Sequence, residues 1–327
     1  MTQLTRRRLF ATAAAAGAAA ALPRLAGGVA QAAVSAGKGT GVYRYKLGSY
    51  EIIQLMDGAR TFPMPDKFVV NVSKDQAIRA AAAAYMPDGK VTIPFSPMII
   101  NTGSKLIAID TGNGLGAYKA SKGAVGQARI NMEAAGIDPK QIDMVIISHF
   151  HGDHIGGLKN ADGSPAFPNA EIKVPAIEQA FWADDSNAAK ANPFNKAWFP
   201  KAKTMMAGLK VTPYDSNKEI APGITSMHTP GHTPGHMSFV VAAGPKHILV
   251  QTDVTNIPSM FLRHPDWHSF FDNQPDVAQA TRHKVYDMAA AEKTTVVGYH
   301  FPYPCVGHVE KAEAGYRLVP VAWDPNG

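Results

Sequence analysis

The segment His149-Phe150-His151-Gly152-Asp153-His154 is the most informative part of this 327-residue chain. It places three imidazoles and one carboxylate within six residues, directly after the apolar run 144–148, which is predicted to be a short strand. Loops at the carboxyl ends of strands are where α/β proteins collect ligands. Imidazole and carboxylate groups suit zinc and similar divalent ions. Because four such groups would crowd one tetrahedral ion, the segment predicts two metal ions a few ångströms apart.

Three glycines accompany this segment: Gly152, Gly156 and Gly157. We expect them to let the backbone turn tightly enough to aim the neighbouring side chains inward. Burying so many imidazole and carboxylate groups on one loop would be costly without a cation.

Predicted strands and helices alternate on both sides of the segment. Apolar runs predict strand pairs at 42–47 with 50–55, 98–101 with 105–110 and 237–241 with 247–252, and further strands at 144–148, 172–174 and 294–299. Helices are predicted at 73–85, 125–135, from 176 onward and at 273–292. This alternation predicts a layered α/β domain. Two of the strand pairs end in an aspartate, which suits a fold of two related halves, although chance explains the recurrence nearly as well.

Further candidate ligands lie downstream. The segment 228–236 contains His228, His232 and His236, and its prolines exclude one face of a helix as the cause of their spacing. Spacing alone does not choose among these three histidines. Asp253 and His300 each end a predicted strand.

Together these segments resemble the metallo-β-lactamase superfamily. The first matches its H-x-H-x-D-H signature, and Gly231-His232-Thr233-Pro234-Gly235-His236 matches its G-H-T-x-G-H segment. Within the superfamily the chain is similar to the methyl parathion hydrolase group over nearly its whole length, including the stretches 101–106, 166–170 and 315–321. The resemblance implies a four-layer αββα sandwich.

The same resemblance implies a set of site residues. It assigns His149, His151 and His232 to a first metal, and Asp153, His154 and His300 to a second, with Asp253 bridging both. It implies that a hydroxide bridging the two ions, beside Asp253 and Asp153, attacks the substrate, and we expect the ions to be zinc. Trp182 and Phe194 are expected as walls of the substrate pocket. We expect Asp110 to orient ligands through hydrogen bonds, and His228 and His236 to support or pack.

A hydrolase of activated ester-like bonds follows from this resemblance, with a small apolar or aromatic lactone, aryl ester or phosphotriester as substrate. The segment 113–118 departs from the aromatic pattern of the methyl parathion hydrolase group, which favours a lactone or aryl ester. Three alternatives stay open: a β-lactamase, an iron-dependent redox member of the superfamily, and an exported metal-binding protein without turnover.

The first 32 residues have the pattern of an export signal. Arg6-Arg7-Arg8-Leu9-Phe10 precedes an alanine-rich stretch to Leu22, and Ala30-Gln31-Ala32 forms a cleavage site. The arginine pair resembles a twin-arginine signal. We therefore expect a periplasmic or secreted protein in which residues 33–327 form a single domain.

The charge balance and the apolar content of the chain limit the classes of partner it can have. Residues 1–32 hold four arginines and no acidic residue, so removing them lowers the formal charge from +6 to +2. That balance gives no case for nucleic acid, and no apolar run approaches the ~20 residues that span a bilayer as a helix. The single cysteine, Cys305, excludes an intramolecular disulfide. The sequence allows a homodimer.

Overall fold

The structure is a computed structural model that describes residues 41–322. The predicted export signal and its cleavage site after Ala32 lie outside the described residues. Within the described part, most strands belong to two seven-stranded sheets.

The first sheet has the strand order β1-β2-β5-β6-β7-β8-β9. Its first four strands pair antiparallel and the strands from β6 to β9 pair parallel. The strands are β1 Val42–Leu47, β2 Tyr50–Leu55, β5 Met98–Asn101, β6 Leu106–Ile109, β7 Met144–Ile146, β8 Glu171–Pro175 and β9 Val211–Tyr214.

The second sheet has the order β10-β11-β12-β13-β14-β15-β16, and only β13 and β14 pair parallel. The strands are β10 Glu219–Ala221, β11 Ile224–His228, β12 Met237–Ala243, β13 Lys246–Thr252, β14 Thr295–Gly298, β15 Val306–Ala312 and β16 Gly315–Pro320. Each sheet thus contains an antiparallel hairpin followed by a parallel strand, β5-β6-β7 in one and β12-β13-β14 in the other. This recurrence agrees with the interpretation of the chain as two related halves.

Side chains of the central strands alternate between two buried layers. Ile107 and Ile109 of β6 face the core between the sheets, whereas Ala108 packs toward helices. In β13, Ile248 faces the same core and Leu249 faces a helix. Such strands are apolar on both faces because both faces are covered.

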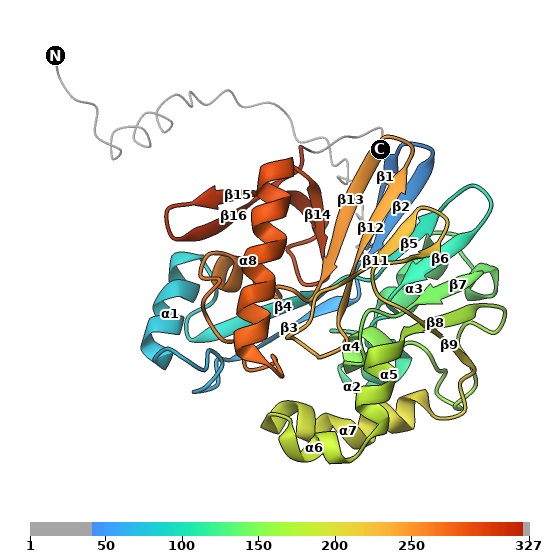
Figure 1. Cartoon of the computed structure of the whole chain (residues 1–327). Helices are drawn as coiled ribbons and strands as arrows, with labels where there is room; N and C mark the ends of the chain where they lie inside the picture. The colour runs from blue at the N-terminus through green and yellow to red at the C-terminus, as the bar shows by residue number, and fades with distance from the viewer. Residues whose placement is uncertain (1–40, 323–327) are drawn as a thin grey trace, which may run out of the picture. The chain divides into compact units, whose positions relative to one another are not determined.

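Helices cover the outer face of each sheet. The first sheet packs against α3 Ala128–Ala134, α5 Ala176–Ala183 and α7 Pro193–Met206. The second packs against α8 Pro275–Glu292, and the buried Cys305 belongs to that layer (Figure 1). The order helix, sheet, sheet, helix confirms the expected αββα sandwich. The remaining helices are α1 Lys74–Ala83, α2 Gly114–Ala120, α4 Gly152–Ile155, α6 Ser186–Lys190, a 3₁₀ turn at Pro139–Gln141 and a π-helix at Pro258–Leu262.

The sequence prediction missed several elements and misplaced the start of one. Helices α2, α4, α6 and α7 and strands β9, β10, β11, β15 and β16 were not predicted. A two-stranded sheet of β3 Gly58–Pro63 and β4 Lys90–Phe95 was not predicted, because prolines and charged residues interrupt its apolar pattern. The helix expected from residue 125 begins at Ala128, since Gly126 takes a φ of 82° that a helix cannot accommodate. Within residues 41–322, no helix combines the length and apolar character needed to cross a membrane.

Candidate metal centre

The seven predicted ligands meet where strands of both sheets end. His149 follows β7, α4 carries Asp153 and His154, His232 lies between β11 and β12, and Asp253 and His300 follow β13 and β14. Their ligand atoms form three overlapping groups, each within 4.8 Å: His149, His151 and His232; His149, His154 and Asp253; Asp153, His154 and His300. Six of the seven residues are at most 4% exposed.

The first group is a set of three imidazoles whose nitrogens face one another. His151 Nδ1 lies 3.1 Å from His149 Nε2 and 2.9 Å from His232 Nε2. The other ring nitrogen of His151 donates to Asn195 Oδ1 at 2.7 Å, and that of His232 donates to Asp272 Oδ1 at 3.0 Å.

The outer nitrogen of His149, which is the ring nitrogen that does not face the other imidazoles, is Nδ1, and it lies 3.0 Å from Ser148 Oγ. The Ser148 hydroxyl donates its proton to Asp110 Oδ2, so its oxygen accepts a hydrogen bond from His149. Each outer nitrogen thus carries the ring proton, and three lone pairs converge on one point.

Burial keeps the rings of His149 and His151 neutral. It lowers the pKa of His149 well below its usual value and that of His151 to about 3. Lone pairs this close repel unless a cation lies between them. Two nitrogens bound to one zinc ion at 2.0–2.1 Å with tetrahedral angles lie about 3.4 Å apart. The first group therefore fits a divalent ion in both chemistry and spacing.

The group of Asp153, His154 and His300, called the second group from here on, combines two imidazoles with a carboxylate. His154 Nε2 and His300 Nε2 lie 3.5 Å and 3.4 Å from Asp153 Oδ2. Their outer nitrogens donate to Asp110 Oδ2 at 2.8 Å and to the Pro94 carbonyl at 2.7 Å. His154 Nε2 is buried and has no hydrogen-bond partner among residues 41–322. Buried polar atoms almost always have a hydrogen-bond partner, and a metal ligand is an exception because its lone pair binds the ion instead.

Asp253 lies between the two groups. Its Oδ2 is 2.9 Å from His300 Nε2 and 3.4 Å from His232 Nε2, and its Oδ1 is 3.4 Å from His154 Nε2. Burial alone would raise the pKa of Asp253, but His300 and His154 outweigh burial and hold that pKa well below its usual value. The carboxylate is therefore charged and placed to contact ions in both groups.

The acidic residues in turn favour positive charge at the second group. Burial would lower the pKa of His154, yet Asp253, Asp153 and Asp110 together raise it well above its usual value. For Asp153, burial raises the pKa, but the neighbouring His154 and His300 lower it overall to about 2. The cluster of His and Asp side chains fits a metal site.

Residues that hold the ligands were only partly found from sequence. Asp110 was expected, and it accepts from Ser148 N–H at 2.8 Å as well as from His154. Asn195 and Asp272 were missed because they lie 44 and 40 residues from the histidines they orient, so no local spacing marks them.

His236 and His228 support the loops. Asp253 N–H donates to His236 Nε2 at 3.1 Å, and the other ring nitrogen of His236 donates to the Thr229 carbonyl at 2.9 Å. His228 Nε2 donates to the Pro234 carbonyl at 3.0 Å. Neither histidine belongs to the three groups of converging atoms, which leaves His232 as the candidate ligand of this segment.

The glycines of the motif have a different role from the one expected. None of Gly152, Gly156 and Gly157 takes a positive φ. They are needed for close approach: a Cβ at Gly157 would lie 2.2 Å from the Thr111 carbonyl oxygen, and one at Gly152 would lie 2.5 Å from the Trp198 ring. The small residue makes room for neighbouring elements rather than providing an unusual backbone turn.

Gly157→Ala should therefore lower the free energy of unfolding by about 1–3 kcal/mol, the usual cost of forcing extra volume into a packed region. Urea unfolding measures the change. Gly116→Ala is the control, because a Cβ there meets nothing within 4 Å and alanine is the better helix former. Equal stability of the Gly157→Ala variant and the wild type would contradict the role in close approach.

The two predicted pocket walls lie in different places. Phe194 lines a cavity of about 300 Å³ together with Pro193, Ala197, Trp198, Lys201 and Phe270. Its ring lies 5.3 Å from that of His151. Trp182 does not line this cavity: it is 2% exposed, packs on Phe199 and donates to Glu178 Oε1 at 2.7 Å. The expectation for Trp182 is corrected accordingly, since its indole N–H needs a buried acceptor.

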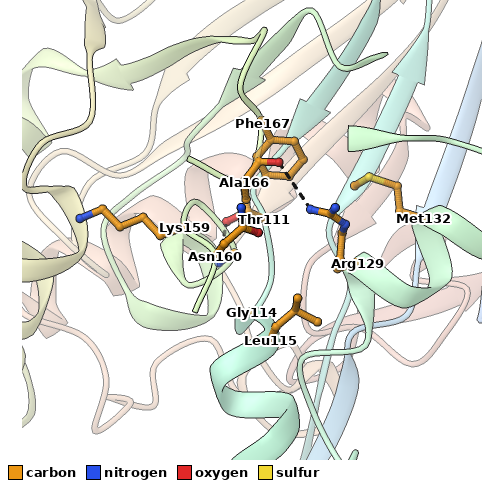
Figure 2. Close-up of a pocket in the computed structure, with 10 residues that line it drawn as sticks. Thr111, Gly114, Leu115, Arg129, Met132, Lys159, Asn160, Ala166 and Phe167 are labelled. Atoms are coloured by element: carbon orange, nitrogen blue, oxygen red, sulfur yellow. Dashed lines mark hydrogen bonds between the residues drawn. The ribbon is translucent and has the colours of Figure 1, made fainter. Parts of the chain in front are cut away.

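A second, narrow crevice lies between α2, α3 and the loop after α4 (Figure 2). Leu115, Met132 and Phe167 line it, and the Arg129 guanidinium donates to the Ala166 carbonyl at 3.4 Å. None of the seven predicted ligands lines this crevice. The segment 113–118 thus faces the crevice through Leu115.

Comparison with known proteins agrees with this geometry. The sequence profile of the metallo-beta-lactamase superfamily matches residues 96–300. The hydrolase AbOPH "in beta lactamase superfamily" is 26% identical, with 87% of this chain and 99% of that chain covered and a TM-score of 0.79. AidC, described as a dizinc quorum-quenching lactonase in complex with a product, is 27% identical over 87% and 98% of the two chains, with a TM-score of 0.80.

A probable metal-dependent hydrolase from Staphylococcus aureus shares the fold, at 18% identity over 85% and 99% of the two chains and a TM-score of 0.70. The profile match covers the strands and loops that bring the His and Asp side chains together. This chain belongs to the metallo-beta-lactamase superfamily and is a hydrolase of that superfamily.

Proposed function

We propose that this chain is a dinuclear zinc hydrolase that opens lactones or cleaves aryl esters, with phosphotriesters as slower substrates. The observation that carries the proposal is the convergence of three imidazole lone pairs on one side of Asp253 and of two imidazoles and a carboxylate on the other. The similarity to AidC, a dizinc lactonase by its description, supports the ester-opening activity.

The arrangement of the residues suits attack on an ester. When bound, divalent ions supply Lewis acidity, which makes hydroxide available near neutral pH and polarises an ester carbonyl. Asp153 is 21% exposed and is the most accessible of the seven residues, so substrate reaches the centre from its side. The cavity lined by Phe194, Trp198 and Phe270 is linked to the centre through Phe194, whose ring lies 5.3 Å from that of His151, and this cavity would hold the apolar part of the substrate.

A substrate panel tests the proposal. Purified protein with its metal content measured is assayed for kcat/KM on an N-acyl homoserine lactone, dihydrocoumarin, phenyl acetate, methyl parathion and a β-lactam. We expect about two zinc equivalents, the highest values on a lactone or the aryl ester, and loss of activity with a chelator that added zinc restores.

Other outcomes would contradict the proposal in distinct ways. A preference for the β-lactam indicates a β-lactamase. Bound iron with an absorbance that changes on reduction indicates a redox enzyme, since zinc is colourless and does not change oxidation state. Two bound metals without turnover of any substrate indicate a metal-binding protein.

Phe194→Ala should lower kcat/KM for substrates with a long acyl chain or an aryl group by about 10-fold to 200-fold, the range expected for lost apolar contacts in a pocket. A substrate with a short acyl group should be affected far less. Tyr85→Ala, at a residue 97% exposed, is the control. An equal loss for short and long substrates would show that Phe194 acts on the metal centre rather than on the substrate's apolar part.

A further inference from the structure

Glu178 is a fully buried carboxylate in the first turn of α5 that no part of the proposed reaction uses. It accepts four hydrogen bonds. Oε1 accepts from Phe150 N–H at 3.1 Å and from Trp182 Nε1–H at 2.7 Å. Oε2 accepts from Thr233 Oγ1–H and Gly235 N–H, each at 2.9 Å.

Three of these donors belong to loops that carry the first group of imidazoles. Phe150 lies between His149 and His151, and Thr233 directly follows His232. One loop follows a strand of the first sheet and the other joins two strands of the second sheet. A single carboxylate therefore fastens together two loops whose imidazole nitrogens lie 2.9 Å apart.

The loop that contains Gly235 is shaped for this contact. A Cβ at Gly235 would lie 2.3 Å from Glu178 N and 2.7 Å from Glu178 Oε2, so only glycine lets the loop approach the start of α5. On the other side, Trp198 closes over Gly152 and donates to the Phe150 carbonyl at 2.6 Å. Both loops are thus packed against helices that present side chains to their backbones.

From these contacts we infer that Glu178 is a positioning residue, which sets the separation of His151 and His232 and thereby the metal affinity of the first group. The inference rests on the proposed metal site. It is specific to the first group, because the second group is oriented by Asp110 and the Pro94 carbonyl and not by Glu178.

The hydrogen-bond partners of Glu178 require a negatively charged side chain at this position. Three of the four partners can only donate, and the Thr233 hydroxyl donates here as well, so the surroundings suit a carboxylate that accepts at both oxygens. An amide of the same shape would turn its NH₂ group toward one pair of donors. Glu178→Gln should therefore fail to replace glutamate even though its size is unchanged.

Stepwise metal titration against a competing chelator tests the inference. Glu178→Gln is expected to weaken binding at one of the two sites by about 10-fold to 100-fold, the usual effect of removing a group that orients a ligand. The other site should stay within about threefold. Cobalt(II) spectra identify the weakened site, because beside the shared Asp253 one site has three imidazoles and the other has two imidazoles and a further carboxylate.

Two further variants accompany it. Thr233→Val keeps the shape of the side chain and removes one hydrogen bond, so a smaller loss at the same site is expected if Glu178→Gln folds poorly. Glu133→Gln, on the exposed face of α3, is the control and should bind both metals as the wild type does. Weakening of both sites to the same extent would indicate a general structural role and overturn the inference, as would unchanged affinities in both test variants.

Hydrogen exchange of the metal-free protein separates this inference from the proposed function. The Phe150 and Gly235 amides should exchange at least about 10-fold faster in Glu178→Gln than in the wild type, whereas the Ser148 amide, which donates to Asp110, should not change. Unchanged exchange at Phe150 and Gly235 overturns the inference whether or not metal binds. If the wild-type protein binds no metal and Glu178→Gln still shows this exchange pattern, both the proposed function and the inferred control of metal affinity are overturned. The role of Glu178 would then be limited to holding the two loops together.

Discussion

Replacement of Asp253 by asparagine should abolish ester hydrolysis while leaving the protein folded. Within the described part of the chain, Asp253 is the carboxylate whose oxygens lie within 3.4 Å of imidazoles in both groups. Asparagine keeps the size of the side chain but removes its negative charge. Metal catalysis supplies several kcal/mol, and each 1.36 kcal/mol is a factor of ten, so kcat should fall on the order of 10³-fold or more.

The measurement is kcat/KM on the best substrate of the panel, with metal content and thermal unfolding determined on the same sample. His151→Ala removes a nitrogen of the first group and should lose activity to a similar extent. Asp88→Asn, at an exposed position, is the control. Retention of the full rate by either test variant would refute the role assigned to the centre.

Replacement of Arg282 by methionine should destabilise the protein by about 3–5 kcal/mol, the usual effect of breaking a buried ion pair. Arg282 is 1% exposed on α8 and pairs with the carboxylate of Asp272. It also donates to the carbonyls of Trp267 at 2.6 Å and Val254 at 3.2 Å. Without the guanidinium, Asp272 is left as a buried charge whose remaining side-chain partner is His232.

Urea unfolding of the metal-free protein measures this change. The matched control is Arg317→Met, because the ion pair of Arg317 with Glu310 is exposed and such pairs contribute about 0–1 kcal/mol. The double variant Arg282→Met, Asp272→Asn removes both charges and should recover part of the loss. Similar small losses in the Arg282 and Arg317 variants would show that burial does not strengthen the Arg282 pair.

The candidate ligands could be found from sequence because their chemistry is concentrated. Three histidines and an aspartate within six residues are costly to bury together unless a cation binds them, and strand ends placed Asp253 and His300 at the same edge. The groups that orient the ligands have no such concentration. Asn195, Asp272 and Glu178 are ordinary polar residues in helices or loops, and their importance arises only when the chain brings them beside His151, His232 and Phe150.

The expectations for Trp182 and for the motif glycines were wrong for a related reason. Aromatic residues near a site are as often buried supports as pocket walls, and composition does not separate Trp182 from Phe194. The role of Gly157 depends on the Thr111 carbonyl 46 residues away in the chain, and backbone conformation is the property a sequence suggests first.

The distribution of candidate ligands between the sheets has a mechanical consequence. Each group draws side chains from both halves of the sandwich: His149 and His151 meet His232, and Asp153 and His154 meet His300. An ion bound in either group would therefore be a cross-link between the halves, and a ligand that binds the native state alone stabilises it. The one cysteine of this chain cannot form an internal disulfide, so metal coordination would take the place of a covalent cross-link between the two halves.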